Sequence, residues 1–246
     1  MTVLFLTATI TPPRDAPLLK RTDVRLRIDD YKTAFAHYCN EIGQAGYDRI
    51  VFVENSGYGV EFLSPIAKAA NASDRVEVLS YKGLLAGATR FYGECSLLKY
   101  GFETSRFIRE SGPGAIVWKV AGRYIVPNLA AIIKGASGAA DFYCHCRNWP
   151  MRYVDFCAAG FRTRSALEIL DVILSEPDVR GKDEAVLRDL IDEGKLARFR
   201  IEPRFARVPD FVGVCGRDNA DYQSPAHRMK YFLRVAASRV APRLWL

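Results

Sequence analysis

Apolar and polar positions along the chain follow two periods, one typical of buried strands and one typical of amphipathic helices. Short apolar runs predict strands at residues 2–10, 49–53 and 76–80, from residue 115, and at residues 140–146. Apolar positions three and four residues apart predict the helices, which are 31–42, 60–70, from about 93 to 108, from Pro127, 164–176 and 183–194. Strand and helix alternate five times before residue 150, so we expect an α/β fold with a mostly parallel sheet and helices on both faces.

Turn residues and helix-capping residues predict further boundaries of strands and helices. Thr11, Pro12 and Pro13 predict a turn after the first strand, and the basic residues 14–27 are expected to form an irregular surface loop. Asp29 or Asp30 is expected to cap the helix that begins near Tyr31. Residues 198–205 are compatible with a late strand, residues 211–216 with a loop or an edge strand, and the charged helix 183–194 with a solvated face.

The tail differs from the rest of the chain, and we divide the sequence into a domain of residues 1–222 and a basic amphipathic helix in residues 223–246. The helix has an apolar stripe of Met229, Phe232, Leu233, Ala236 and Val240, flanked by Arg228, Lys230, Arg234 and Arg239. Such a helix can lie in an anionic membrane interface. It can equally pack on the domain with its arginines in water, and the sequence leaves both interpretations open.

Charge and composition narrow the class of partner. The chain has 246 residues, 49% of them apolar, and a formal net charge of +7, which favours phosphate-bearing partners. No apolar run is long enough to span a bilayer, and residues 1–6 read as a strand rather than a signal peptide. We expect a cytoplasmic protein that can be peripheral at the inner face of the membrane.

The six cysteines are expected to be reduced core residues because they are scattered through apolar surroundings. Cys144, His145 and Cys146 resemble a metal cluster at first. Alternate residues of a strand face opposite ways, however, so the two cysteines would share a face that His145 does not. No second pair stands at zinc-ligand spacing, and we predict no metal site.

Polar residues gather where the predicted strands end. The candidates are Thr7, Thr9, Glu54, Asn55, Arg90, Glu94, Lys119, Gly122, Arg123, Tyr124, Asn128, Arg147, Trp149 and Asp155. In an open α/β sheet the carboxyl ends of parallel strands lie at one edge, where ligands bind. We therefore expect these residues to converge on one cleft. Glu94, at the start of a helix, is either a capping group or a site residue.

Several common motifs are missing. The chain has no Gly-rich dinucleotide fingerprint after its first strand, no phosphate-binding loop ending in Gly-Lys-Ser/Thr, and no Gly-x-Ser-x-Gly elbow. It has no evident histidine-centred acid–base set either. Carboxylates are left as the available bases, and lysine and arginine as the groups that can stabilise an anion.

Three segments carry a resemblance to a known family. Residues 90–94 (Arg-Phe-Tyr-Gly-Glu), 119–124 (Lys-Val-Ala-Gly-Arg-Tyr) and 152–156 (Arg-Tyr-Val-Asp-Phe) resemble small bacterial glycosyltransferases of surface-polysaccharide assembly, which have a GT-A-like fold. The resemblance covers about residues 1–220. It implies a nucleotide-sugar donor and a glycan or lipid-linked acceptor at the inner face of the membrane, as in lipopolysaccharide O-antigen or capsule synthesis.

The sequence departs from that family at one point. Most GT-A enzymes hold a divalent metal with an Asp-x-Asp motif near the fourth strand, but here residues 119–124 carry Lys119 and Arg123 and no carboxylate. Fixed cations can neutralise a leaving phosphate without a metal. If the resemblance holds, we expect no metal cofactor.

The resemblance also suggests roles. Glu94 or Asp155 would be the general base. Arg123, Lys119 and Arg90 would stabilise the departing phosphate. The other donor-binding candidates are Thr7, Thr9, Glu54, Asn55, Gly122, Tyr124 and Asn128, and Arg147 and Trp149 would face the acceptor.

Two other classes compete with this interpretation. The positive charge and the aromatic, basic run 147–153 are also found in proteins that bind or process nucleic acid, but the basic residues are spread along the chain rather than gathered in one module, so no nucleic-acid partner is expected. A non-enzymatic scaffold bound to the membrane through its C-terminal helix is the second alternative.

Overall fold

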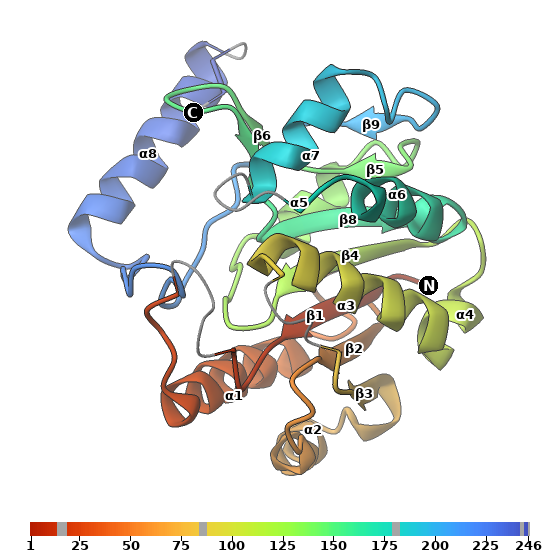
Figure 1. Ribbon diagram of the computed structural model, residues 1–246. Coiled ribbons are helices and arrows are strands. Elements are labelled where there is room, and N and C mark those ends of the chain that lie inside the picture. The colour runs from red at the N-terminus through yellow and green to blue at the C-terminus, as the bar shows by residue number, and fades with distance from the viewer. Residues whose placement is uncertain (14–18, 84–87, 179–182, 242–243, 246) are drawn as a thin grey trace.

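A seven-stranded sheet forms the centre of the computed structural model (Figure 1). The structure describes residues 1–13, 19–83, 88–178, 183–241 and 244–245. The strands are β1 (Val3–Ala8), β2 (Arg49–Glu54), β3 (Val76–Ser80), β4 (Ile116–Ala121), β5 (Phe142–Tyr143), β8 (Ala158–Arg162) and β9 (Ile201–Glu202). They follow the order β3-β2-β1-β4-β8-β5-β9, and β8 is antiparallel to both of its neighbours. A second, two-stranded sheet pairs β6 (Cys146–Arg147) with β7 (Tyr153–Val154).

Helices cover both faces of the sheet. They are α1 (Val24–Asn40), α2 (Ser64–Ala69), α3 (Arg90–Thr104), α4 (Arg106–Ser111), α5 (Leu129–Gly135), α6 (Thr163–Ser175), α7 (Asp183–Asp192) and α8 (Pro225–Val240), with short 3-10 turns at Glu61–Leu63 and Ser73–Arg75. One buried cluster joins the sheet to α3, α4, α6 and α7, and the other joins it to α1, α2 and α5. Helix α8 stands at the left side of the molecule in Figure 1. The predicted α/β fold, with a mostly parallel sheet, is confirmed.

Alternation along β4 decides which polar residue faces which helix. Successive side chains of a strand point to opposite faces. Val117 belongs to the cluster under α3, whereas Trp118 and Val120 belong to the cluster under α1. Lys119 therefore points toward α3 from the middle of the sheet, where it is fully buried.

Gly122 follows β4 at a point of close contact with β1. Its N–H donates to the carbonyl of Thr7 at 2.9 Å, and a Cβ built on Gly122 would lie 2.8 Å from that same oxygen. No larger residue fits this contact. The packing of two strands therefore requires a glycine at position 122.

Three helices, α1, α3 and α5, begin at other residues than predicted. Helix α1 begins at Val24, within the segment expected to be a loop, because the Asp23 side chain accepts from the N–H groups of Arg25 (2.8 Å) and Leu26 (3.1 Å). The prediction that Asp29 or Asp30 caps this helix is wrong, and Asp30 instead pairs with Arg21 at 2.6 Å. Residues 14–18 of the predicted loop lie outside the described residues.

Helix α3 begins at Arg90, three residues before the predicted start, with Thr89 as its cap. It ends at Thr104, and Ser105 caps the separate helix α4, so the expected single helix to residue 108 is two helices. Helix α5 begins at Leu129 rather than at Pro127. Residues 84–87 of the predicted loop before α3 lie outside the described residues.

The predicted fifth strand at 140–146 is divided between β5 in the main sheet and β6 in the small one. The strand β8 was not predicted. It lies between β4 and β5, and the small residues Ala158, Ala159 and Gly160 give it a weak apolar signal. Residues 211–216 form isolated bridges, including one between Ile125 and Val212.

Gly101 lies where α3 packs closely on the sheet. A Cβ on Gly101 would lie 2.3 Å from the ring of Phe5, which is fully buried, and 3.2 Å from Val53. Gly101→Ala should therefore lower the free energy of unfolding by about 1–3 kcal/mol, measured by urea denaturation. Gly93→Ala in the same helix meets no atom within 4 Å and should stabilise by up to about 1 kcal/mol. Equal effects of the two changes would contradict this packing.

Candidate functional site

A cleft opens where β1, β2 and β4 end, beside the first turns of α3. It contains about 1110 Å³ of space, including the part open to solvent at its mouth. The carboxyl edge of the sheet is where the sequence places the site, so the structure brings polar strand ends together as expected.

Glu94 forms part of the cleft wall, and one of its carboxylate oxygens is bound by Thr7 and Lys119. Its Oε1 accepts a hydrogen bond from Thr7 Oγ1 at 2.7 Å and lies 2.7 Å from the ammonium nitrogen of Lys119. Lys119 also donates to the carbonyl oxygen of Phe156 and lies over the Phe156 ring. Among the described residues, no hydrogen-bond donor contacts Oε2 of Glu94, so this oxygen can accept from a ligand.

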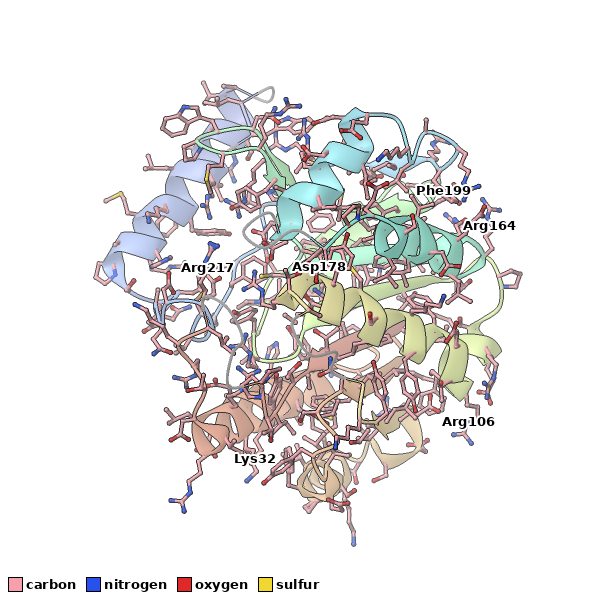
Figure 2. The ribbon with its side chains drawn as sticks, viewed as in Figure 1. Lys32, Arg106, Arg164, Asp178, Phe199 and Arg217 are labelled. Atoms are coloured by element: carbon pink, nitrogen blue, oxygen red, sulfur yellow. The ribbon has the colours of Figure 1, made fainter. Side chains whose placement is uncertain are left out.

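Arginine side chains supply the positive charge of the cleft. Arg123 lies over the Tyr124 ring, and a long hydrogen bond of 3.4 Å joins it to the carbonyl of Val214. Arg90, at the start of α3, pairs with Glu184 of α7 at 2.8 Å. Arg217 is exposed, and Figure 2 shows it on the left of the view between α1 and α8. Within the described part of the chain, Arg123 and Arg217 have no carboxylate within ion-pair distance.

One side of the cleft is apolar, and its floor is rigid. Pro12, Pro13 and Leu19 form the apolar wall. At the floor, Thr9 Oγ1 donates to Asn55 Oδ1 at 2.7 Å. Arg27 is buried, and its guanidinium donates to the carbonyls of Thr9 and Arg21, so it holds the chain after β1 rather than binding a ligand.

Seven of the fourteen predicted site residues line this cleft, and seven do not. Those that line it are Thr7, Thr9, Asn55, Arg90, Glu94, Arg123 and Tyr124. Those that do not are Glu54, Lys119, Gly122, Asn128, Arg147, Trp149 and Asp155. Lys119 reaches the site only through Glu94, so the structure does not support its assignment as a direct phosphate ligand.

Glu54 and Asn128 satisfy backbone groups instead of facing the cleft. The buried carboxylate of Glu54 accepts from the N–H groups of Ile10 (3.0 Å), Ser56 (2.9 Å) and Tyr58 (3.0 Å), which fixes the loops after β1 and β2. Asn128 donates to the carbonyl of Val208 at 2.8 Å and accepts from the N–H of Asp210 at 3.0 Å. Both residues hold loops together.

Asp155 and Arg147 form a second polar cluster beside the cleft. The Arg147 guanidinium donates to the Asp155 carboxylate, and both side chains are largely buried. Burial, the largest single effect, would raise the pKa of Asp155, but the charge and the hydrogen bond of Arg147, together with the effects of His145 and Arg234, lower this pKa below its usual value. Both Asp155 and Glu94 pair with a cation, but Asp155 lies outside the cleft and is therefore a weaker candidate for a general base than Glu94. Trp149 is 62% exposed and contacts the C-terminus instead of the cleft.

The sequence prediction missed six residues with polar or thiol side chains that line the cleft, which are Arg27, Tyr31, Thr89, Cys157, Glu184 and Arg217. Arg27 and Tyr31 are four residues apart, so they lie on one face of the helix that Asp23 caps. This spacing is the sequence signal that could have identified them together. Glu184 was assigned to a solvated helix face, but it pairs with Arg90. Arg217 lies in an irregular segment, and no sequence pattern points to it.

The described residues include no group of three or more His, Cys, Asp or Glu side chains that could hold a metal ion. Cys144 and Cys146 are buried with their sulfur atoms 3.8 Å apart, as the shared strand face predicts, and His145 instead stacks on Phe205. All six cysteines are free thiols.

His145 gives the structure a measurable pH dependence. Burial, reinforced by the charge of Arg147, lowers the pKa of His145 to about 3, and its Nδ1 has no hydrogen-bond partner among the described residues. In the unfolded chain the imidazole takes a proton below about pH 6.5. The unfolded state therefore binds more protons, and stability falls as the pH drops from about 6.5 toward 3, by at most about 1.4 kcal/mol per pH unit.

His145→Phe should remove this loss because phenylalanine can keep the stacking on Phe205 but cannot take a proton. Between pH 6.5 and pH 4 we expect the wild type to lose about 2 kcal/mol more unfolding free energy than the variant. Urea denaturation at several pH values measures the difference, and pH 7 to 8 serves as a control range in which the two proteins should run parallel. Parallel curves down to pH 4 would contradict a buried neutral imidazole.

No protein-family model and no curated protein matches the sequence. Among solved structures, a protein of Desulfovibrio desulfuricans described provisionally as a nucleotide-diphospho-sugar transferase has a TM-score of 0.48 and 11% identity, covering 82% of this chain and 78% of that one. HddC from Yersinia pseudotuberculosis has a TM-score of 0.41 and 10% identity, covering 94% and 98%. The bifunctional glycosyltransferase WbbM has a TM-score of 0.44 and 11% identity, covering 82% of this chain and 38% of its own length. These values describe a broad likeness, from which we take no substrate and no residue role.

Proposed function

We propose that this protein is a glycosyltransferase that moves a sugar from a nucleotide-activated donor to a hydroxyl group of a glycan or lipid-linked acceptor, in the assembly of a bacterial surface polysaccharide. The observation that carries the proposal is the cleft at the carboxyl edge of the sheet, where arginines and the fixed carboxylate of Glu94 face one space. The sequence motifs at 90–94 and 119–124 supply the walls of this space.

The arginines have a role in bond breaking. When the bond between the anomeric carbon and the donor phosphate oxygen breaks, the leaving nucleotide gains negative charge. Arg123 and Arg217 line the cleft and have no carboxylate partner within the described chain, so their guanidinium groups are available to donate to phosphate oxygens. Charge-assisted hydrogen bonds of this kind are among the strongest available in a protein. Pro12, Pro13 and Leu19 offer an apolar surface against which a nucleobase can pack.

Glu94 is suited to remove the proton from the acceptor hydroxyl. The acceptor hydroxyl oxygen forms a bond to the anomeric carbon while its proton passes to Glu94 Oε2, and the nucleotide departs with the electron pair of the broken bond. Oε1 is held by Thr7 and Lys119, so the carboxylate keeps one orientation. A base whose position is fixed in advance lowers the entropic cost of reaching the reactive geometry.

We propose that this transfer uses no divalent metal. The two carboxylates that line the cleft within the described residues, Glu94 and Glu184, are each engaged by a cation, Lys119 and Arg90 respectively. Arg123 and Arg217 line the same cleft and can supply the positive charge that compensates a phosphate. This charge arrangement supports the proposal.

Arg123→Ala should weaken the binding of nucleoside diphosphate by about 10- to 100-fold, because it removes a charged donor to the phosphates. The melting temperature should change little, since the hydrogen bond of Arg123 to Val214 is long, at 3.4 Å. Isothermal titration with a panel of nucleoside diphosphates measures the affinity. Arg164→Ala is the matched control, because Arg164 is exposed on the opposite side of the molecule (Figure 2).

The same titration in the presence of EDTA tests whether nucleotide binding requires a divalent metal. We expect the same affinity with and without the chelator. Binding that disappears with EDTA would overturn metal independence, and the absence of binding to any nucleotide would favour the non-enzymatic scaffold instead.

Glu94→Gln should lower turnover by about 10²- to 10⁴-fold, the usual contribution of a positioned general base, with little change in nucleotide affinity. Turnover is followed as release of nucleotide from the donor selected by the titration. Asp155→Asn separates the two candidate bases, since Asp155 lies outside the cleft and its replacement should leave turnover within about threefold of wild type. Loss of turnover in Asp155→Asn alone, with circular dichroism unchanged, would assign the base to Asp155.

A further inference from the structure

Exposed apolar side chains are concentrated on one part of the molecule. Six large apolar side chains of the described residues are more than half exposed, with exposed fractions from 57% to 85%. They are Trp149, Met151, Met229, Phe232, Leu233 and Val240. All six come from α8 or from the loop between β6 and β7. Scattered exposed apolar residues are normal, but a concentration of this kind marks an interaction site.

Helix α8 turns its apolar stripe away from the protein. At about 100° per residue, Met229, Phe232, Leu233, Ala236 and Val240 share one side of the helix, and all five are exposed. The opposite side, which includes Tyr231, Arg234 and Val235, is half-buried. An α8 that packs its stripe on the domain therefore does not match the structure.

The loop between β6 and β7 lies next to the end of this helix. The N–H groups of Asn148 and Trp149 both donate to the carbonyl of Trp245, at 2.7 and 3.2 Å. The bonds join the loop to the chain that follows α8, so the exposed Trp149 and Met151 lie beside the C-terminal end of the helix. In Figure 1 the loop reaches across the upper end of α8. We call the five stripe residues together with Trp149 and Met151 the α8 surface.

The charges around the α8 surface are positive. Residues 222–246 contain Arg228, Lys230, Arg234, Arg239 and Arg243 and no Asp or Glu. Lys230 and Arg239 are exposed on the two flanks of the stripe. Arg152, beside Met151, is also exposed, but it pairs with Asp192. An apolar stripe with cations on both flanks is the composition of helices that lie in the headgroup region of anionic membranes.

We propose that the α8 surface docks this protein on an anionic lipid membrane, with the stripe and Trp149 inserted among the lipid headgroups. A second copy of this chain is a poorer occupant, because it would bring another set of cations against Lys230 and Arg239. No helix of the described chain is long and apolar enough to cross a bilayer. The proposal concerns lipid binding and does not depend on the transferase activity.

Vesicle flotation of the full chain tests it. We expect binding to vesicles of phosphatidylcholine with phosphatidylserine, weak binding to phosphatidylcholine alone, and a loss of binding as salt is raised. Leu233→Glu should lower the affinity by about tenfold or more, because it replaces an inserted apolar side chain with a negative one. Leu26→Glu is the matched control, since Leu26 is similarly exposed on α1, at 47%, away from the α8 surface. It should bind as the wild type does.

Tryptophan emission tests the loop separately. The chain has three tryptophans. Trp118 is buried and Trp245 packs against the buried core, so the exposed Trp149 should give the larger part of a blue shift on adding the anionic vesicles. That part of the shift should be lost in Trp149→Phe. A blue shift unchanged by this substitution would remove the loop from the membrane contact.

Three results would overturn the proposal. The first is no flotation with anionic vesicles, and the second is an equal loss in Leu26→Glu and Leu233→Glu. The third is a wild-type dimer in sedimentation that Leu233→Glu converts to a monomer, which would assign the stripe to a second copy of the chain.

Discussion

The buried pair of Lys119 and Glu94 organises the site. A fully buried ammonium group is costly unless it is paired and hydrogen-bonded. Lys119 meets this requirement with Glu94 from α3 and the carbonyl of Phe156, while Thr7 of β1 donates to the same carboxylate. Three segments far apart in the sequence are therefore tied to the middle of β4. The pairing joins the first turn of α3 to the sheet beside the cleft.

The same strand end provides two cations with different tasks. Lys119 points from the sheet toward α3 and holds Glu94, whereas Arg123, four residues later and past the close contact at Gly122, reaches the cleft. The sequence shows both residues at one strand end but not which way each points. That is why the prediction treated them alike. The direction follows only once the pairing of β4 with β1 is known.

Much of the fold could be predicted because apolar runs and helical periodicity are local signals. The strand β8 could not, since its small residues become a strand by pairing between β4 and β5, a tertiary effect that overrides weak propensity. The predicted site residues also divide into those that follow local signals and those whose role depends on tertiary contacts. Thr9 and Asn55 follow predicted strands and do line the cleft. Glu54 and Asn128 instead form hydrogen bonds with backbone N–H and carbonyl groups of loops. These backbone groups need a partner only once the loops have folded, so the sequence does not show the pairing.

One short segment connects the cleft to the α8 surface. Cys157 lines the cleft, and the carbonyl of Phe156 holds Lys119. Asp155 pairs with Arg147 at the base of the loop whose tip carries the exposed Trp149. A lipid-linked acceptor is anchored in the membrane and can present only its headgroup sugars to an enzyme. If both proposals hold, docking through the α8 surface places this segment between lipid and cleft. The acceptor hydroxyl would then approach Glu94 from the side of Cys157, and the donor would enter from the side of Pro12 and Leu19.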